Sequence, residues 1–377
     1  MPQENKKKER VKKMIKFGKW VVKFRIPILI LSFLLLIPTG IIYMNTRINY
    51  DILSYLPGDI ETMKGQDILL DEFGTGAFSV AVIDGMQEKE ISQLEDKLKE
   101  IDHVKDVLWY GALADISIPM DMLPDDLKDS LQNADTGSQL MIITFDTSMS
   151  ADETLDAIEE IRGLTNEQCL LSGMSAVVTD IKKICNSEVI MYVVIAAGLS
   201  ALVLALTMDS FLLPFIFLLS IGMAIVYNLG TNFIAGEISF VTQALAAVLQ
   251  LAVTMDYSIF LLNSFEENKK RFPGDKNRAM GHAISNTFKS IVSSSITTVA
   301  GFAALCLMTF ALGKNLGIVM AKGVIIGVIC CVTLLPAIIL IFDPLIEKTK
   351  HKPLIKNTNR LSGFIIRHYK ILSLIHI

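Results

Sequence analysis

The apolar positions of this chain gather in long runs and do not alternate with polar ones. Runs of about 20 apolar residues have the length that a membrane-spanning helix requires. A further apolar run begins after Lys370 and stops at Ile377, which is too short to span. The pattern therefore predicts an α-helical integral membrane protein with six spanning helices plus a partial seventh. The six are expected at about 26–45, 187–207, 211–232, 238–264, 290–311 and 317–342.

Residues 46–186 have the shorter, mixed patterns of a folded domain. Apart from a helix expected from Pro124 to Ala134, the order of elements is β-α-β followed by β-α-β, which is typical of an α+β ferredoxin-like domain. A helix that begins near Ser175 is expected to run on into the second spanning segment. The predicted elements are a strand at 78–83, a helix at 88–101, strands at 104–109 and 139–145, a helix at 151–163 and a strand at 168–171.

Charge segregation predicts the topology. Residues 1–25 carry 10 basic and 2 acidic residues, whereas residues 47–186 carry 28 acidic and 10 basic ones. Basic segments favour the cytoplasmic side, so we expect the N-terminus inside the cell and the α+β domain outside. The basic, polar segment 265–289 is expected to be a cytoplasmic loop. The tail at 1–25 either lies partly on the inner membrane surface or acts as a simple anchor, and nucleic-acid binding is not expected.

These patterns divide the chain into five parts. They are a basic cytoplasmic tail (1–25), a first transmembrane helix (26–45), an extracytoplasmic α+β domain (46–186), transmembrane helices two to six (187–342), and a cytoplasmic linker with the start of a seventh helix (343–377).

Asp256 interrupts the fourth apolar run. A charged carboxylate in the bilayer interior costs at least about 2.5–3.5 kcal/mol, so such a residue normally has a partner or a function. Helical spacing places it on one face with Ala252, Val253, Phe260 and Asn263. If buried, it would favour its protonated form, and an acid that changes protonation with conformation could couple transport to a proton gradient. The alternative is a permanently protonated acid that hydrogen-bonds a neighbouring helix.

Other polar residues lie inside the expected helices. Tyr257 either donates a hydrogen bond to an acid on a partner helix or packs as an aromatic residue. Ser290, Ser294, Thr297 and Gly301 share a face of the fifth helix, with Thr298 beside them, and they suit either a proton-relay wall or close helix contacts. Lys322 in the sixth helix can snorkel outward, pair with an acid or join the relay. Weaker candidates are Gln243, Gln250, Asn228 and Asn232.

The motifs of common enzymes are absent from the sequence. No GxxxxGK[ST] segment, no HExxH and no serine–histidine pair in a plausible context is present, and the five cysteines lack metal-site spacing. We therefore expect neither an enzyme nor a bound cofactor or metal.

Several motifs resemble one family, the MMPL branch of the resistance-nodulation-division (RND) superfamily of membrane transporters, in its N-terminal half. Helices two to six also resemble a sterol-sensing, patched-like domain. The matching segments are Asp51 to Pro57, Thr254 to Leu262, Gly281 to Ile284, Ser293 to Thr298 with Gly301-Phe302, Met320 to Gly323 and Leu335 to Ala337.

This resemblance implies proton-driven export of lipids or other hydrophobic or amphiphilic compounds across the plasma or inner membrane. Asp256 would carry the proton with Tyr257 beside it, and the outer domain would be a porter domain. Because family members usually have two such halves, a second transporter half is expected, in the same longer chain or in another subunit of an oligomer, with membrane lipids around both. The alternative is a sterol-sensing-like lipid-binding or regulatory scaffold that uses no gradient.

Overall fold

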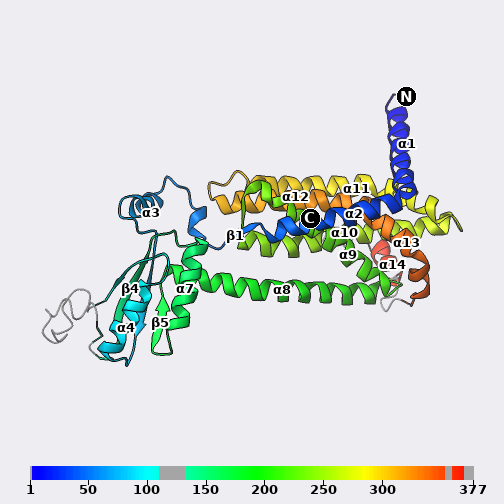
Figure 1. Cartoon of the computed structure of the whole chain (residues 1–377). Helices are drawn as coiled ribbons and strands as arrows, with labels where there is room; N and C mark the ends of the chain where they lie inside the picture. Colours follow the sequence, from blue (N-terminus) through cyan, green and yellow to red (C-terminus); the bar gives the residue numbers. More distant parts are fainter. Residues whose placement is uncertain (1, 110–131, 134, 353–358, 369–377) are drawn as a thin grey trace.

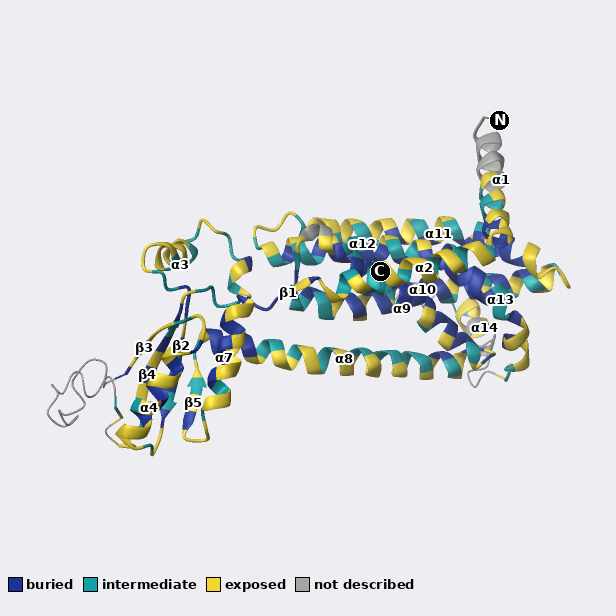
Figure 2. Cartoon of the chain, viewed as in Figure 1, coloured by how far each residue is buried: buried dark blue, intermediate teal, exposed yellow. Residues whose placement is uncertain are grey.

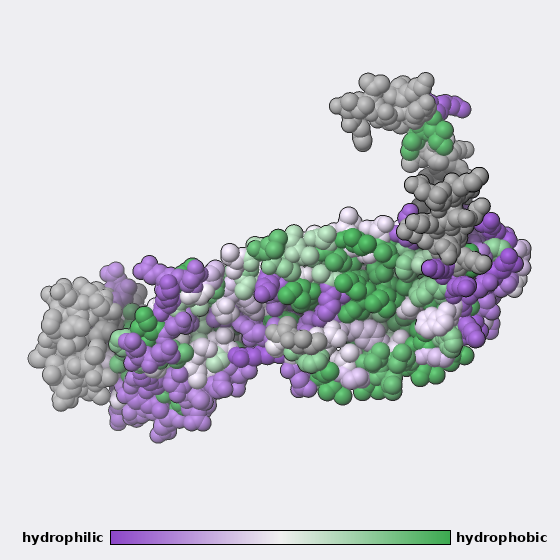
Figure 3. Space-filling view, turned by 90° about the horizontal axis from the view of Figure 1, so that it is seen from above, coloured by the Kyte–Doolittle hydropathy of each residue, from purple (hydrophilic) through white to green (hydrophobic). Residues whose placement is uncertain are grey.

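The computed structural model describes residues 2–109, 132–133, 135–352 and 359–368, and it consists of a helical bundle with an α+β domain at one end (Figure 1). Six described helical segments are long and apolar enough to cross a membrane. In Figure 3 apolar residues form the middle of the bundle and polar residues cover its two ends. The bundle elements are α1 (Pro2–Lys23), α2 (Arg25–Met44), α8 (Met174–Thr207), α9 (Leu212–Gly230), η3 (Thr231–Ala235), α10 (Phe240–Arg271), α11 (Lys276–Leu305), α12 (Ala311–Val332), α13 (Leu334–Lys348) and α14 (Asn359–Arg367).

The prediction that residues 265–289 form a loop is wrong. Helix α10 continues to Arg271 and α11 begins at Lys276, so the connection is a short turn. Gly274 has a positive φ of 82°, and the Asp275 side chain caps α11 by accepting a hydrogen bond from the Arg278 backbone N–H (2.9 Å). The apolar pattern fades near Leu262 because the helices become amphipathic where they leave the apolar part of the bundle.

The sixth predicted helix, at about 317–342, corresponds to one candidate span over Ala311–Lys348, which is interrupted at Thr333 between α12 and α13. Pro336 explains the break, since its ring lacks a backbone N–H and clashes with the carbonyl four residues earlier, that of Val332. The partial seventh helix predicted after Lys370 and most of the helix predicted from Pro124 to Ala134 lie outside the described residues.

The α+β domain contains the predicted strands and helices, with ends within two residues of those expected. Its sheet has the order β3-β4-β2-β5, and every pair of neighbours is antiparallel. A helix at 61–71 and two short strands that pair with each other were not predicted. The elements are β1 (Arg47–Asn49), η1 (Leu53–Tyr55), α3 (Glu61–Asp71), β2 (Ala77–Ile83), α4 (Glu88–Lys99), β3 (Val104–Leu108), β4 (Gln139–Phe145), α7 (Asp152–Leu164), β5 (Cys169–Ser172) and β6 (Glu237–Ser239).

The two faces of this sheet differ. Alternate residues of β2 and β4 point into a core shared with α4 and α7, in which Ile143 and Phe145 are fully buried. The residues between them point to the opposite face, which is also apolar. There Phe78 is 53% exposed and Leu170 is 65% exposed, and Leu140, Ile142 and Leu108 are exposed as well. Figure 2 shows the exposed positions along these strands.

A small parallel sheet joins the α+β domain to the bundle. Strand β1 follows α2 and pairs with β6, which immediately precedes α10. The Asn49 amide donates hydrogen bonds to Glu237 Oε1 and Ser54 Oγ, both at 2.8 Å. Burial raises the pKa of the neighbouring Asp51, whose carboxylate accepts a hydrogen bond from the Leu53 N–H (2.8 Å). The helix that carries Asp256 is thus connected directly to β1, the strand that leads from α2 into the α+β domain.

Glycines allow the closest helix contacts. At Gly230 of α9 an added Cβ would overlap the Thr39 carbonyl of α2, and at Gly18 of α1 it would overlap the Gly281 carbonyl of α11. Small residues that let backbones approach this closely are typical of helix pairs in membranes. Helix α1 is therefore packed against α11, and Val21 of α1 is fully buried. The last part of α1 thus belongs to the packed bundle.

Candidate functional site

Asp256 lies on the exposed face of α10. Ala252, Phe260 and Asn263 are exposed on the same face, as helical spacing predicts, whereas Val253, which was expected on this face, is half-buried against the core. Within residues 2–109, 132–133, 135–352 and 359–368 the Asp256 side chain makes no hydrogen bond or ion pair. Asp256 is therefore not buried by the described residues: the bundle leaves it on its surface, because the buried positions of α10 are those that face α9, α11 and α12.

Helix α11 runs antiparallel beside α10. Its polar face lies at about the same distance from the α10–α11 turn as Asp256 does. Asp256 is 15 residues before Arg271, where α10 ends, and Ile291 is 15 residues after Lys276, where α11 begins. At 1.5 Å per residue both lie about 22 Å from the turn. Ser290 and Ser294 flank Ile291, and both are exposed, as are Thr297 and Gly301. Asp256 and these small polar residues thus face outward at similar depth.

The threonines of this face bond to their own helix. Thr297 Oγ1 donates to the Ser294 carbonyl at 2.7 Å, and Thr298 Oγ1 donates to the same carbonyl at 3.1 Å. Within the described residues no hydroxyl among Ser290, Ser294, Thr297 and Thr298 hydrogen-bonds another helix. The face is therefore free to meet a partner outside these residues.

Tyr257 points away from this face. Its side chain is only 7% exposed and belongs to the apolar core of the bundle, together with Phe217 and Leu261. Consecutive residues of a helix are rotated by about 100°, so Asp256 and Tyr257 cannot both face the exposed surface squarely. In this conformation Tyr257 packs as a core aromatic residue.

A second polar set lies inside the bundle, among residues that the sequence marked as weaker candidates. Asn228 of α9 donates to Gln250 Oε1 of α10 at 3.0 Å, and both side chains are buried. Lys322 of α12 donates to the Asn232 amide oxygen in η3. Gly323 of α12 leaves room for the hydrogen bond between Asn228 and Gln250, because a Cβ at this position would lie 2.5 Å from Asn228 Nδ2. Lys322 therefore pairs with an amide and does not snorkel outward.

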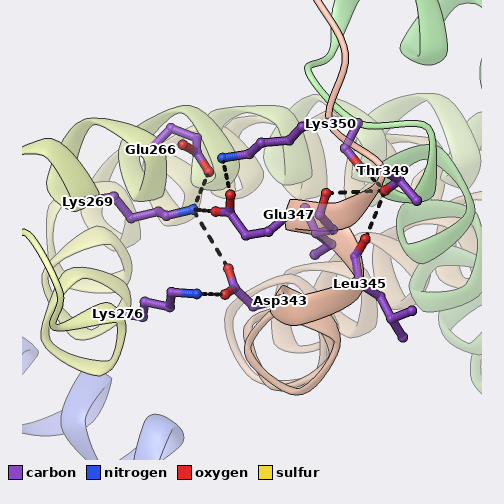
Figure 4. Close-up of polar contacts among 10 residues, drawn as sticks. Glu266, Lys269, Lys276, Asp343, Leu345, Glu347, Thr349 and Lys350 are labelled. Carbon is purple, nitrogen blue, oxygen red and sulfur yellow. Dashed lines mark hydrogen bonds and ion pairs between the residues drawn. The ribbon is translucent and has the colours of Figure 1, made fainter.

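An ion-pair cluster at the α10–α11 end of the bundle was not predicted (Figure 4). Asp343 of α13 is 2% exposed and pairs with Lys276 and with Lys269, the latter at 3.7 Å. Lys269 also contacts Glu347 at 2.9 Å and Glu266 at 3.2 Å. The cluster joins the end of α10, the start of α11 and the end of α13. These residues are far apart in sequence, and no spacing rule connects Asp343 with Lys276.

We expect Asp343→Asn to lower the free energy of unfolding by about 1–3 kcal/mol, because an amide cannot neutralise two lysines and the substitution leaves a buried pair broken. Thermal melting of the purified protein in detergent measures this. Glu347→Gln is the control, since that carboxylate is half exposed and its pairs are worth about 0–1 kcal/mol. An equal loss of stability in both variants would show that the burial of Asp343 does not add to the stability of the protein.

Comparisons with known proteins complete this description. The model of the MMPL family matches residues 74–357, more than half of the chain. A putative membrane protein of Streptomyces coelicolor, SCO5905, is 25% identical over 60% of this chain and 28% of its own length. The apo-petrobactin exporter of Bacillus anthracis is 23% identical over 84% of this chain and 44% of its own length. The probable transport protein MmpL12 of Mycobacterium tuberculosis is 23% identical over 72% of this chain and 23% of its own length. The chain thus spans less than half the length of each of these relatives.

Proposed function

This chain belongs to the MMPL family, and we propose that it forms part of a proton-driven exporter of lipids or other hydrophobic or amphiphilic compounds. Relatives named as an exporter and as a transport protein support a role in transport. The six apolar helical segments support a multi-pass membrane protein, which we place in the plasma or inner membrane with its N-terminus in the cytoplasm.

The position of Asp256 is the observation that carries this proposal. An acid on the outer face of an apolar bundle would meet lipid, and a carboxylate in lipid is costly. A second transporter half that covers α10 and α11 would remove this cost, supply polar partners and leave the acid accessible to protons. We therefore propose that Asp256 binds and releases the proton, and that the face containing Ser290, Ser294 and Thr297 lies against this second half.

Three other candidate residues, Thr298, Tyr257 and Lys322, differ in their contacts. Thr298 lies beside the α11 face and belongs to the same proposed contact. Tyr257 takes part in the relay only if the bundle rearranges, because its side chain packs in the core. Lys322 with Asn232 is proposed to tie α12 to η3.

We further propose that the α+β domain is a ferredoxin-like, extracytoplasmic porter domain. The antiparallel order β3-β4-β2-β5 with two helices on one face supports the ferredoxin-like assignment. The acidic composition of residues 47–186 supports an outer location. The exposed apolar face around Phe78 and Leu170 supports contact with a hydrophobic substrate or with a second porter domain.

Efflux in the presence and absence of a protonophore tests this function. The full-length gene is expressed in cells that lack competing exporters, and the loss of a fluorescent amphiphile from preloaded cells is followed. Proton-driven export predicts faster efflux than in empty-vector cells, and the protonophore should abolish the difference. A lipid-binding scaffold without gradient coupling predicts no difference between the cells, and export that continues with the protonophore would contradict proton coupling.

A further inference from the structure

A basic cavity lies where α1, α2 and the start of α11 meet. Its volume is about 480 Å³, within the range of about 300–1,000 Å³ that is usual for small-molecule sites. Four cationic side chains line it, together with a single acid, Asp275. They are Lys19 and Lys23 of α1, Arg25 of α2 and Arg278 of α11.

The positive charge of this cavity is not neutralised by the protein. Within residues 2–109, 132–133, 135–352 and 359–368 none of the four cations forms an ion pair. The Asp275 carboxylate is engaged in capping α11. Gathering like charges around one cavity is unfavourable unless an anion joins them, so the cavity is electrostatically suited to an anion.

The two arginines of the cavity make contacts that leave hydrogen-bond donors free. Arg25 Nη1 donates to Asn277 Oδ1 at 2.7 Å, which leaves the other N–H groups of its guanidinium available. The Arg278 guanidinium lies over the Phe272 ring, 4.4 Å from its centroid. Lys19 and Lys23 are one helical turn apart and thus share a face of α1. Guanidinium and ammonium groups arranged in this way suit a phosphate.

The surroundings of the cavity are those of a membrane surface. In Figure 1 helix α1 projects from the end of the bundle at a steep angle to α2, which runs along the bundle. From the cavity, an exposed apolar stripe follows α2 through Ile26, Ile30, Leu34, Ile37 and Ile41. Ile30 and Leu34 are each 63% exposed. An amphiphile with its headgroup in the cavity would lay its hydrocarbon chains along this stripe.

We propose that this cavity binds the phosphate headgroup of an anionic phospholipid from the leaflet at this end of the bundle, with its acyl chains against α2. The lipid ties α1 to the bundle by neutralising Lys19, Lys23, Arg25 and Arg278 together. This role concerns a resident lipid and is independent of the exported substrate, since it uses neither Asp256 nor the α+β domain.

Lipid titration followed by native mass spectrometry tests this site. The purified full-length protein in detergent is titrated with phosphatidylglycerol or with phosphatidylcholine of the same acyl chains. The wild type should retain one phosphatidylglycerol in preference to phosphatidylcholine. The double variant Lys23→Gln/Arg278→Gln should bind phosphatidylglycerol about 30-fold more weakly, since each basic residue near a membrane surface contributes roughly fivefold.

The matched control is Lys16→Gln/Lys270→Gln, which removes the same charge from exposed positions of α1 and α10 outside the cavity. It should keep the wild-type preference. Equal weakening of phosphatidylglycerol binding in both double variants would show a general attraction to the protein surface and would overturn the proposed site. A wild type that does not distinguish the two lipids would overturn it as well.

Inorganic phosphate is added as a competitor, and displacement of the lipid at equal concentration would identify a soluble anion as the ligand. If the double variant melts below the wild type in phosphatidylcholine, the single variant Lys19→Gln replaces it.

Discussion

Replacing Asp256 by asparagine in the full-length transporter is expected to reduce proton-driven efflux to the level of cells without the protein. Asparagine has nearly the same size as aspartate, but its amide cannot take up or release a proton. The protein should still be inserted and folded, because Asp256 makes no hydrogen bond or ion pair within the described residues whose loss would weaken the fold. Efflux of a fluorescent amphiphile, normalised to the amount of protein in the membrane, measures the effect.

Glu267→Gln is the matched control for this substitution. Glu267 is an exposed acid on the same face of α10, 11 residues nearer to the α10–α11 turn, where the helix is already polar. Its replacement should leave efflux within about twofold of the wild type, as is usual for surface positions. Efflux at the wild-type rate in Asp256→Asn would remove the proton-carrying role, and equal losses in both variants would indicate a general need for negative charge on this face.

Gly230→Ala is expected to destabilise the protein by about 1–3 kcal/mol, the usual cost of forcing extra volume into a close contact. The new methyl group would overlap the Thr39 carbonyl, so α2 would have to move away from α9. The same shift would disturb the hydrogen bond from the Tyr227 hydroxyl to the Ser32 carbonyl (2.6 Å), which joins the same two helices. Thermal melting of the purified protein in detergent measures the change.

Gly222→Ala, two turns earlier in α9, provides the control. A Cβ at Gly222 has no neighbouring atom within 4 Å, and alanine favours a helix over glycine by about 0.8–1.0 kcal/mol. This variant should therefore melt at or above the wild-type temperature. Destabilisation of similar size at both positions would mean that the packing of α9 on α2 is not the cause.

The local elements of the fold could be predicted from the sequence because they depend on local patterns. Strand β4 begins and ends where the alternation of Gln139 to Phe145 does, and the continuous helix α8 follows from the apolar run after Ser175. The prediction failed where apolar content was used as a measure of helix length. Residues 265–289 are polar, yet α10 and α11 continue through most of them, since amphipathic segments also form helices. The pairing of β1 with β6 joins residues about 190 positions apart, and three-residue strands carry no detectable pattern.

The candidate site was predicted in part. Helical spacing correctly grouped Asp256 with Ala252, Phe260 and Asn263, but it wrongly added Val253, which packs against the core. It also grouped Ser290 with Ser294 and Thr297. The same spacing cannot say which face of a helix its neighbours cover, so it could not show that Asp256 is left uncovered and that Tyr257 is buried. The ion-pair cluster around Asp343 was not predicted, because it lies near a helix end, where charged residues are usually solvated.

Infrared spectroscopy of the full-length protein can follow directly the proton exchange that we propose for Asp256 within the membrane. The wild type should show a protonated-carboxyl band whose intensity falls as the pH rises, and Asp256→Asn should lack this pH-dependent band while Glu267→Gln retains it. A carboxyl band that is unchanged in Asp256→Asn, or one that stays constant at every pH in the wild type, would contradict the claim.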